Sequence, residues 1–203
     1  MPHLKGPAKF MSTHEGEAVT GFILAGGKSK RMGRDKALLE WKHSTLLEHM
    51  VKLLSSVTTE VQVVGREFLP DVLPGRGPLA GILTALQNSQ TEINLVVAVD
   101  LPFLTKAFLR YLVSRIETSR SPLVACKMES YFPLCLGLRG TLVRELEQRV
   151  TGRELSVQSF IESSGPRLII LEPELRRAGF DASMFRNINT EEDYRAAMLS
   201  WAG

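Results

Sequence analysis

The chain has 203 residues, of which 44% are hydrophobic and 23% are charged, and its formal net charge is +3. This composition excludes a disordered protein, and the length suits one α/β domain with a sizeable core. Because the basic residues concentrate between positions 28 and 36, we expect local anion binding rather than a nucleic-acid surface. The two cysteines, Cys126 and Cys135, are too few for a disulfide scaffold and are expected to be buried thiols.

The first residues differ in character from the rest of the chain. Residues 1–18 mix histidine, lysine and glutamate without an apolar stretch of the kind found in secretory signals, and they predict a disordered leader. Residues 19–203 then form a single expected domain. No run of about eighteen apolar residues occurs, so we expect a cytoplasmic protein without a membrane partner.

Apolar runs and helical spacings alternate along the chain. The runs predict strands at 19–25, 60–64, 94–99, 122–127, 132–138 and 167–171. The spacings predict helices at about 46–57, 79–86, 106–116, 142–150, 155–161 and 191–201, with N-caps at Thr45 and Thr105 and a capping box of Thr190 with Asp193. This alternation indicates a three-layer, Rossmann-like α/β fold with a mostly parallel sheet and helices on both faces.

A glycine-rich, basic segment follows the first expected strand. Residues 21–36 read GFILAGGKSKRMGRDK, and neither register of their glycines fits a P-loop or a GxGxxG pattern. Glycine allows a ligand to approach the backbone, and amides and cations in such a turn attract anions. The segment therefore favours a polyphosphate cradle, while a solvated basic loop is the alternative.

Asp100 ends the most apolar of the expected strands. Ligands of open α/β sheets lie beyond the carboxyl ends of the strands, so Asp100 and the basic segment are expected at the same edge. Burying an unpaired carboxylate is costly, and Mg²⁺ is usually held by one or two carboxylates together with substrate phosphates. The sequence thus favours Asp100 as a magnesium ligand, with a helix-capping role as the alternative.

Several motifs, taken in order, resemble the molybdenum cofactor guanylyltransferases, which belong to the Rossmann-like nucleotidyltransferases. They are Leu24-Ala-Gly-Gly27, Arg31-Met-Gly33 with Asp35-Lys36, Gly77-Pro-Leu-Ala-Gly81, Asp100-Leu-Pro102 and Asn187-Ile-Asn189. This resemblance implies transfer of GMP from GTP to molybdenum-molybdopterin, with release of pyrophosphate and dependence on Mg²⁺. Enzymes of molybdenum cofactor synthesis and cofactor-accepting enzymes are implied partners, and the chain is expected to be a monomer or a weak homo-oligomer.

The resemblance also implies roles for individual residues. Catalytic roles fall on Arg31, Lys36 and Asp100, and metal binding falls on Asp100 and, more weakly, Asn189. Nucleotide contacts fall on Leu24, Ala25, Gly26, Gly27, Lys36, Asp71, Gly77, Pro78, Leu79, Gly81 and Asp100. Taken alone, Asp71 could make only a turn, and Asn187 and Asn189 could serve only as capping residues.

Two positions depart from the family pattern. An asparagine that contacts GTP in the family is replaced by Val64 or Gly65, and a His-Pro pair on the cofactor side is replaced by Phe132-Pro133. Gly26 resembles the guanylyl branch, because cytidylyl relatives more often have alanine there. A cytidylyltransferase, a guanylyltransferase for another phosphorylated acceptor, and a non-catalytic carrier of nucleotide or molybdopterin remain alternatives.

Overall fold

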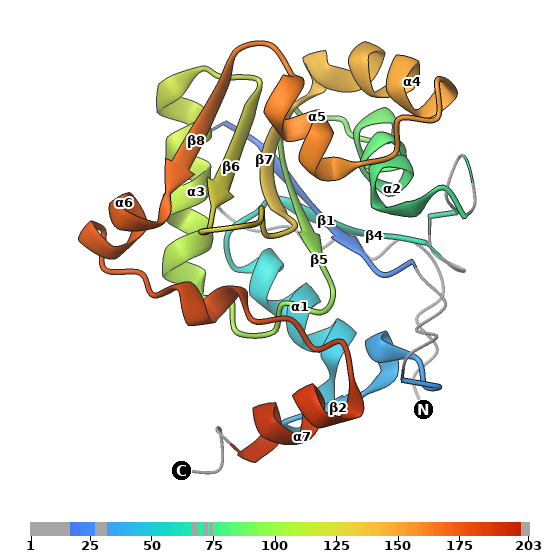
Figure 1. The fold of residues 1–203 in the computed structure, drawn as a ribbon, viewed down its shortest axis with the longest axis vertical. Helices are drawn as coiled ribbons and strands as arrows, with labels where there is room; N and C mark the ends of the chain where they lie inside the picture. The colour runs from blue at the N-terminus through green and yellow to red at the C-terminus, as the bar shows by residue number, and fades with distance from the viewer. Residues whose placement is uncertain (1–16, 27–31, 66–68, 71–72, 74, 200–203) are drawn as a thin grey trace.

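The computed structural model describes residues 17–26, 32–65, 69, 70, 73 and 75–199. Within them, one sheet has six strands in the order β4-β1-β5-β7-β6-β8 (Figure 1). Its strands are β1 (Val19–Leu24), β4 (Glu60–Val64), β5 (Ile93–Ala98), β6 (Leu123–Lys127), β7 (Cys135–Arg139) and β8 (Arg167–Leu171). The α-helices are α1 (Leu46–Ser55), α2 (Gly77–Gln87), α3 (Lys106–Ser119), α4 (Val143–Thr151), α5 (Val157–Ser163), α6 (Glu172–Arg177) and α7 (Glu191–Leu199).

The sheet is mostly parallel, as the sequence predicted. β1 pairs in parallel with both β4 and β5, and β6 pairs in parallel with β8. β7 runs antiparallel to β5 and β6, between which it lies. Because the chain leaves β1 first for β4 on one side and then for β5 on the other, the strand order reverses at β1. A site for a ligand is expected beyond the carboxyl end of that strand.

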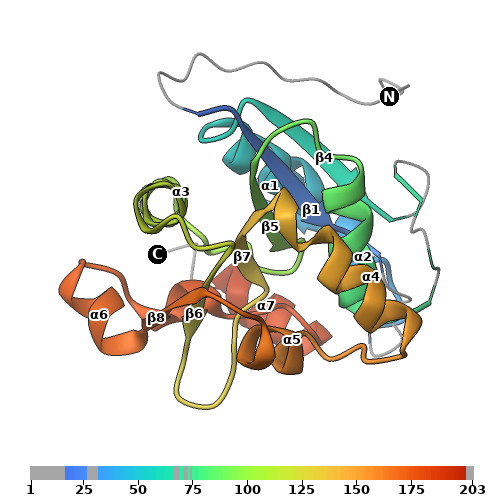
Figure 2. The same cartoon turned by 90° about the horizontal axis from the view of Figure 1, so that it is seen from above.

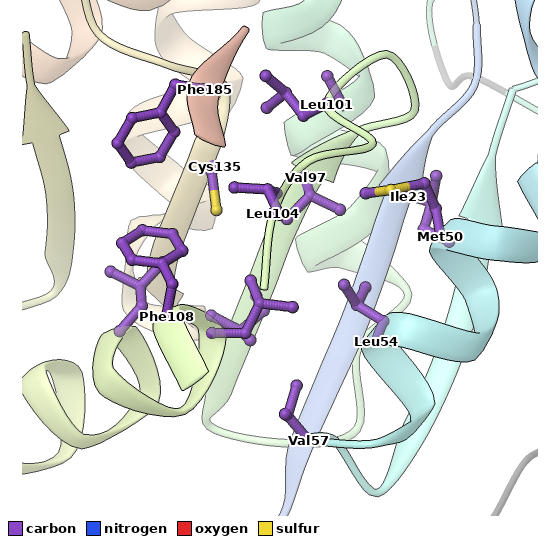
Figure 3. Packing of buried hydrophobic residues seen from close by; sticks show 14 of the residues in the cluster. Ile23, Met50, Leu54, Val57, Val97, Leu101, Leu104, Phe108, Cys135 and Phe185 are labelled. Carbon is purple, nitrogen blue, oxygen red and sulfur yellow. The ribbon is translucent and has the colours of Figure 1, made fainter. Parts of the chain in front are cut away.

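Helices cover both faces of the sheet, which confirms the three-layer prediction. Figure 2 shows α1 and α3 on one side of the sheet and α2, α4 and α5 on the other. The first face buries Met50 and Leu54 of α1 and Phe108 of α3 against Ile23 and other strand residues (Figure 3). Burying each such side chain stabilises the fold by about 1.5–3 kcal/mol. The central strands β1 and β5 are buried along their whole length, so their sequences are largely apolar without alternation.

A third, smaller cluster lies outside the two main layers. Trp41 and Leu46 pack there with Ile188 and with Ala197 of α7. Trp41 belongs to a short hairpin of β2 (Glu40–Trp41) and β3 (Ser44–Thr45), which follows the 3-10 turn η1 (Lys36–Leu38). Figure 1 shows α7 beside β2, although they are distant in the sequence. This cluster attaches the end of the chain to the segment that follows β1.

The structure departs from the sequence prediction mainly at element boundaries. The strand predicted at 132–138 begins only at Cys135, because Pro133 has no N–H and Cys135 N donates to Pro133 O (2.7 Å) in a tight turn. The predicted helix at 155–161 runs from Val157 to Ser163. The sequence patterns do not predict the hairpin β2–β3, α6 or the 3-10 turns η2 (Gly140–Leu142) and η3 (Ala182–Phe185).

The predicted caps are confirmed. Thr45 and Glu48 form a reciprocal capping box at α1, and Thr105 Oγ1 accepts from Phe108 N at α3. Residues 1–16 and Trp201, for which the sequence predicts a leader and a buried helix position, lie outside the described residues. No helix in the described part of the chain is long and apolar enough to cross a membrane.

Candidate functional site

The turn after β1 lies against the ends of two neighbouring strands. Ala25 N donates to Val64 O (2.9 Å), and Val99 N donates to Leu24 O (3.1 Å). Gly65 has φ +100°, and a Cβ added there would lie 2.7 Å from the Cα and N atoms of Gly26. Gly65 is therefore required for this close approach of two backbones.

Three of the predicted site residues meet at one point. Lys36 Nζ donates to Asp100 Oδ2 (3.0 Å) and to Asn189 Oδ1 (2.7 Å). The Lys36 and Asp100 side chains are 17% and 18% exposed, so the pair is open to solvent only on one side. Residues from three distant parts of the chain thus form one polar cluster at the carboxyl ends of β1 and β5. We call Lys36, Asp100 and Asn189 the polar cluster.

Backbone interactions hold each member of the polar cluster in place. Asp35 Oδ1 accepts from Ala37 N (2.9 Å) and starts the 3-10 turn on which Lys36 lies. Ile188 N donates to Asp100 O (3.0 Å), which joins the segment before α7 to the end of β5. The side chain that presents Asn189 Oδ1 therefore comes from a segment anchored directly beside Asp100.

Asp193 fixes the backbone around Asn189. Its Oδ2 accepts from Asn189 N (2.9 Å) and Thr190 N (2.8 Å), while Thr190 Oγ1 accepts from Asp193 N (3.1 Å). This is the predicted capping box of α7. The hydrogen bonds from the Asn189 and Thr190 amides lower the pKa of the Asp193 carboxyl, and the charge of Lys36 adds to the effect. The cap of α7 thus also positions a site residue, a role that the sequence analysis did not assign to Asp193.

His49 of α1 positions the turn that follows Asp100. Its Nε2 lies 3.0 Å from Pro102 O, and because a carbonyl can only accept, this nitrogen carries the proton. Burial lowers the pKa of His49. This hydrogen bond links α1 to the Asp100–Pro102 turn.

The basic segment also contacts α7 through Arg34. Arg34 Nη2 pairs with Glu191 Oε2 (2.5 Å), and its guanidinium lies 6.0 Å from the Tyr194 ring centroid. Tyr194 in turn donates its hydroxyl hydrogen to Glu40 O (2.7 Å). These contacts connect the phosphate-binding candidate segment with the last helix. No pattern in the sequence indicates them, because Arg34 is one of several cations in this segment.

The described oxygen ligands fit a magnesium ion in type and in placement. Asp100 Oδ2 and Asn189 Oδ1 both lie within hydrogen-bonding distance of a single cation, the Lys36 ammonium. Mg²⁺ prefers such hard oxygen ligands and completes its shell with water and substrate phosphates. Among the described residues there is no group of three or more His, Cys, Asp or Glu side chains that could hold an ion by themselves.

The remaining predicted nucleotide contacts fall into three groups. Gly26, Gly77 and Pro78 are exposed near the strand ends, where backbone atoms are open to a ligand. Leu24, Ala25, Leu79 and Gly81 are buried as whole residues, and their contacts with the nucleotide stay predictions. Gly27, Arg31 and Asp71 lie outside the described residues, and their roles stay predictions.

Gly77 and the residues after it form the first turn of α2 rather than a loop. Gly77 has φ +75°, Pro78 lies in the first turn, and the side chain of Arg76 does not cap the helix. The first amides of α2 are therefore not satisfied by a side-chain cap. The positive end of the α2 dipole faces the same edge of the sheet as the turn after β1.

Phe132, at the position where the family resemblance expects histidine, is half-buried. Lys127 Nζ lies 5.5 Å from the centroid of its ring. The β6–β7 connection thus presents an aromatic face and an ammonium group. A cationic side chain is present near this position even though the histidine is absent.

Comparison with known proteins identifies the family. Residues 21–167 match the model of the MobA-like NTP transferase domain. A probable molybdenum cofactor guanylyltransferase from Carboxydothermus hydrogenoformans is 35% identical over 188 residues, which cover 87% of this chain and 93% of that protein. The molybdenum cofactor guanylyltransferase of Xanthomonas euvesicatoria pv. vesicatoria is 37% identical over 139 residues, covering 66% of this chain and 71% of its own.

The fold is also similar to that of a solved structure. The crystal structure of molybdopterin-guanine dinucleotide biosynthesis protein A from Archaeoglobus fulgidus superposes with a TM-score of 0.78 at 23% identity, covering 90% of this chain and 98% of the other. The mixed six-stranded sheet is therefore that of the Rossmann-like nucleotidyltransferases. Together with the motifs at residues 24–36, 77–81, 100–102 and 187–189, these similarities establish that the chain belongs to the molybdenum cofactor guanylyltransferases, within the MobA-like NTP transferase family.

Proposed function

We propose that this enzyme transfers GMP from GTP to the phosphate of molybdenum-molybdopterin, in a reaction that requires Mg²⁺. The products are pyrophosphate and the guanine dinucleotide form of the cofactor. Family membership supports the reaction class and both substrates. The observation that carries the residue assignment is the polar cluster, in which Lys36, Asp100 and Asn189 converge beside the turn that contains Gly26.

The chemistry needs positioning and charge stabilisation rather than a nucleophilic side chain. An oxygen of the acceptor phosphate attacks the α-phosphorus of GTP, the bond from that phosphorus to the bridging oxygen breaks, and pyrophosphate leaves with the bond electrons. The acceptor oxygen is already ionised at neutral pH, so a general base is unnecessary. Such transfers depend on alignment and on neutralising the charge of the transferred group.

The chain supplies cations and amides for this purpose. Lys36 bonds to Asp100, whose neighbour Val99 bonds to Leu24 of β1, and its ammonium is proposed to contact a phosphate at the turn after β1. Arg31 is proposed to act with it on the transferred and leaving phosphates. Gly26 and Gly27 are proposed to let the triphosphate approach the backbone. The uncapped N-terminus of α2 adds a partial positive charge at the same edge.

Asp100 and Asn189 are proposed as the protein ligands of the metal ion. When bound, Mg²⁺ would supply charge neutralisation on the phosphates and would orient them. Asp100 contributes the carboxylate, and Asn189 contributes a neutral oxygen whose position depends on the Asp193 cap. His49 maintains the turn at Pro102 and so acts as a positioning residue.

The nucleotide base and the acceptor are proposed to lie on opposite sides of the polar cluster. Gly77 and Pro78, with the backbone of Leu79 and Gly81, are proposed to line the base side together with Asp71. Phe132 and Lys127 lie on the C-terminal half of the sheet, where the aromatic ring and the ammonium suit a flat, anionic acceptor.

Pyrophosphate release tests this proposal. The purified enzyme is incubated with Mg²⁺ and GTP, CTP or ATP, with and without molybdenum-loaded molybdopterin. We expect release with GTP but not with CTP or ATP, and only when the acceptor is present. Release with CTP would favour cytidylyl transfer, and GTP binding without any release would favour a non-catalytic carrier.

A further inference from the structure

The Lys36 ammonium lies where the metal ion is proposed to bind. Both oxygens assigned to the metal, Asp100 Oδ2 and Asn189 Oδ1, accept hydrogen bonds from this one group, at 3.0 and 2.7 Å. A magnesium ion between the same oxygens would need contacts of about 2.0–2.1 Å. An ammonium and a divalent cation held by these two oxygens would repel each other at a separation of a few ångströms, so occupation by one weakens the binding of the other.

We propose that Lys36 acts as an internal cation that excludes the divalent metal from the nucleotide-free enzyme. The nucleotide exchanges the two cations: its phosphates draw the Lys36 ammonium away from the polar cluster, and the metal ion then takes the vacated oxygens. This inference rests on the proposed function for the identity of the two ligands. It goes further by assigning Lys36 a second role and an order of events, in which the metal enters with the nucleotide.

The Lys36 side chain is suited to such an exchange. Its ammonium is a point charge on a flexible four-carbon stem, and its 17% exposure shows that a path to solvent, and hence to a phosphate, is open. Lys36 lies on a short 3-10 turn rather than on a sheet strand. The charge can therefore move while the strands that carry the site stay fixed.

The backbone segments that carry the two oxygens, in contrast, are held independently of Lys36. Asn189 N bonds to Asp193 Oδ2, and Ile188 N bonds to Asp100 O. These contacts do not involve the Lys36 side chain, so the backbone at Asp100 and Asn189 stays in place when the ammonium leaves, and both side chains stay within reach of a common ion. Removing the Lys36 charge by mutation is therefore expected to create a metal site that the free wild-type enzyme lacks.

The experiment measures Mn²⁺ binding to the nucleotide-free enzyme by electron paramagnetic resonance of free Mn²⁺. We expect Lys36→Met to bind Mn²⁺ about tenfold or more tightly than the wild type, since a repelling charge close to the ion is removed. The matched control is Lys52→Met, which removes an exposed lysine from the last turn of α1. The double variant Lys36→Met/Asp100→Asn should lose the gain, because the carboxylate ligand is gone.

A second measurement keeps the test independent of any one variant's folding. In the wild type, a non-hydrolysable GTP analogue should increase Mn²⁺ affinity strongly, whereas in Lys36→Met, or in Lys36→Gln, the analogue should add much less. Equal Mn²⁺ affinity in wild type, Lys36→Met and Lys52→Met without nucleotide would overturn the inference. Because Mn²⁺ binding needs no turnover, failure of guanylyl transfer with a retained Mn²⁺ gain would reject the proposed function but not the exchange of cations.

Discussion

Replacing Asp100 by asparagine should separate catalysis from stability. The change keeps the shape of the side chain and an oxygen that accepts from Lys36, but it removes the charge that faces the ammonium at 3.0 Å. Loss of one electrostatic group that stabilises the transition state costs about 3–4 kcal/mol, or a 10²–10³-fold decrease in kcat. We expect a decrease of at least this size for Asp100→Asn.

The effect on folding should be small. The Asp100 side chain is 18% exposed and its only change is neutralisation, so we expect a loss of about 1 kcal/mol in the free energy of unfolding. For a chain of this length, that corresponds to a decrease in Tm of about 2–4 °C. Asp100→Ala should have a similar or larger catalytic effect, since it also removes the oxygen.

Pyrophosphate release and thermal unfolding of the same preparations measure both quantities. Asp181→Asn is a matched control, because Asp181 is an exposed N-cap of η3 and asparagine caps equally well. Turnover of Asp100→Asn close to that of the wild type would refute the reasoning about the metal ligand. A fall in Tm of ten degrees or more would instead show that Asp100 serves mainly to hold the fold together.

Three further predictions concern the surroundings of the site. Gly65→Ala should lower the free energy of unfolding by about 1–3 kcal/mol through the positive φ alone. It should also weaken GTP binding by displacing Gly26, which would be measured as a smaller GTP-induced rise in Tm. An unchanged rise in Tm would contradict the role of Gly65 beside the nucleotide site. Burial raises the pKa of Cys126 to about 12 and that of Cys135 well above its ordinary value, so neither thiol should react with a disulfide reagent at pH 8 before unfolding; rapid labelling of the native protein would argue against this. The folded-state pKa of Asp193 lies below its ordinary value of 3.8, so its contribution to stability is present above that pH and is lost as the pH falls through the lowered value. The Tm difference between wild type and Asp193→Asn should therefore be constant above about pH 5 and shrink in stronger acid. A difference that grows in acid would reverse the assignment.

The layered fold could be predicted because its signals are local. The apolar runs at Val19–Leu24 and Ile93–Ala98 are long enough to identify strands that are buried on both faces. The direction of β7 could not be predicted, since an apolar run has the same pattern whichever way the strand runs. The hairpin β2–β3 was missed because strands of two residues are too short to have a period.

The site was predicted as a set of residues but not as an arrangement. The motifs named Lys36, Asp100 and Asn189, and sheet topology placed the first two at the same edge. The Lys36 ammonium joins both oxygens because the Ile188–Asp100 hydrogen bond brings together positions that are distant in the sequence. No local pattern encodes such a contact, and the same holds for the pairing of Arg34 with Glu191.

The most direct test of the account is acceptor-dependent pyrophosphate release from GTP by the wild-type enzyme and by Lys36→Met, Asp100→Asn and Asn189→Ala. We expect release by the wild type with molybdenum-loaded molybdopterin and none without it. Lys36→Met and Asp100→Asn should lose most of this activity, and Asn189→Ala should lose less. Full activity in all three variants would contradict the assignment of the polar cluster as the catalytic centre. Release from CTP in preference to GTP would contradict the choice of nucleotide.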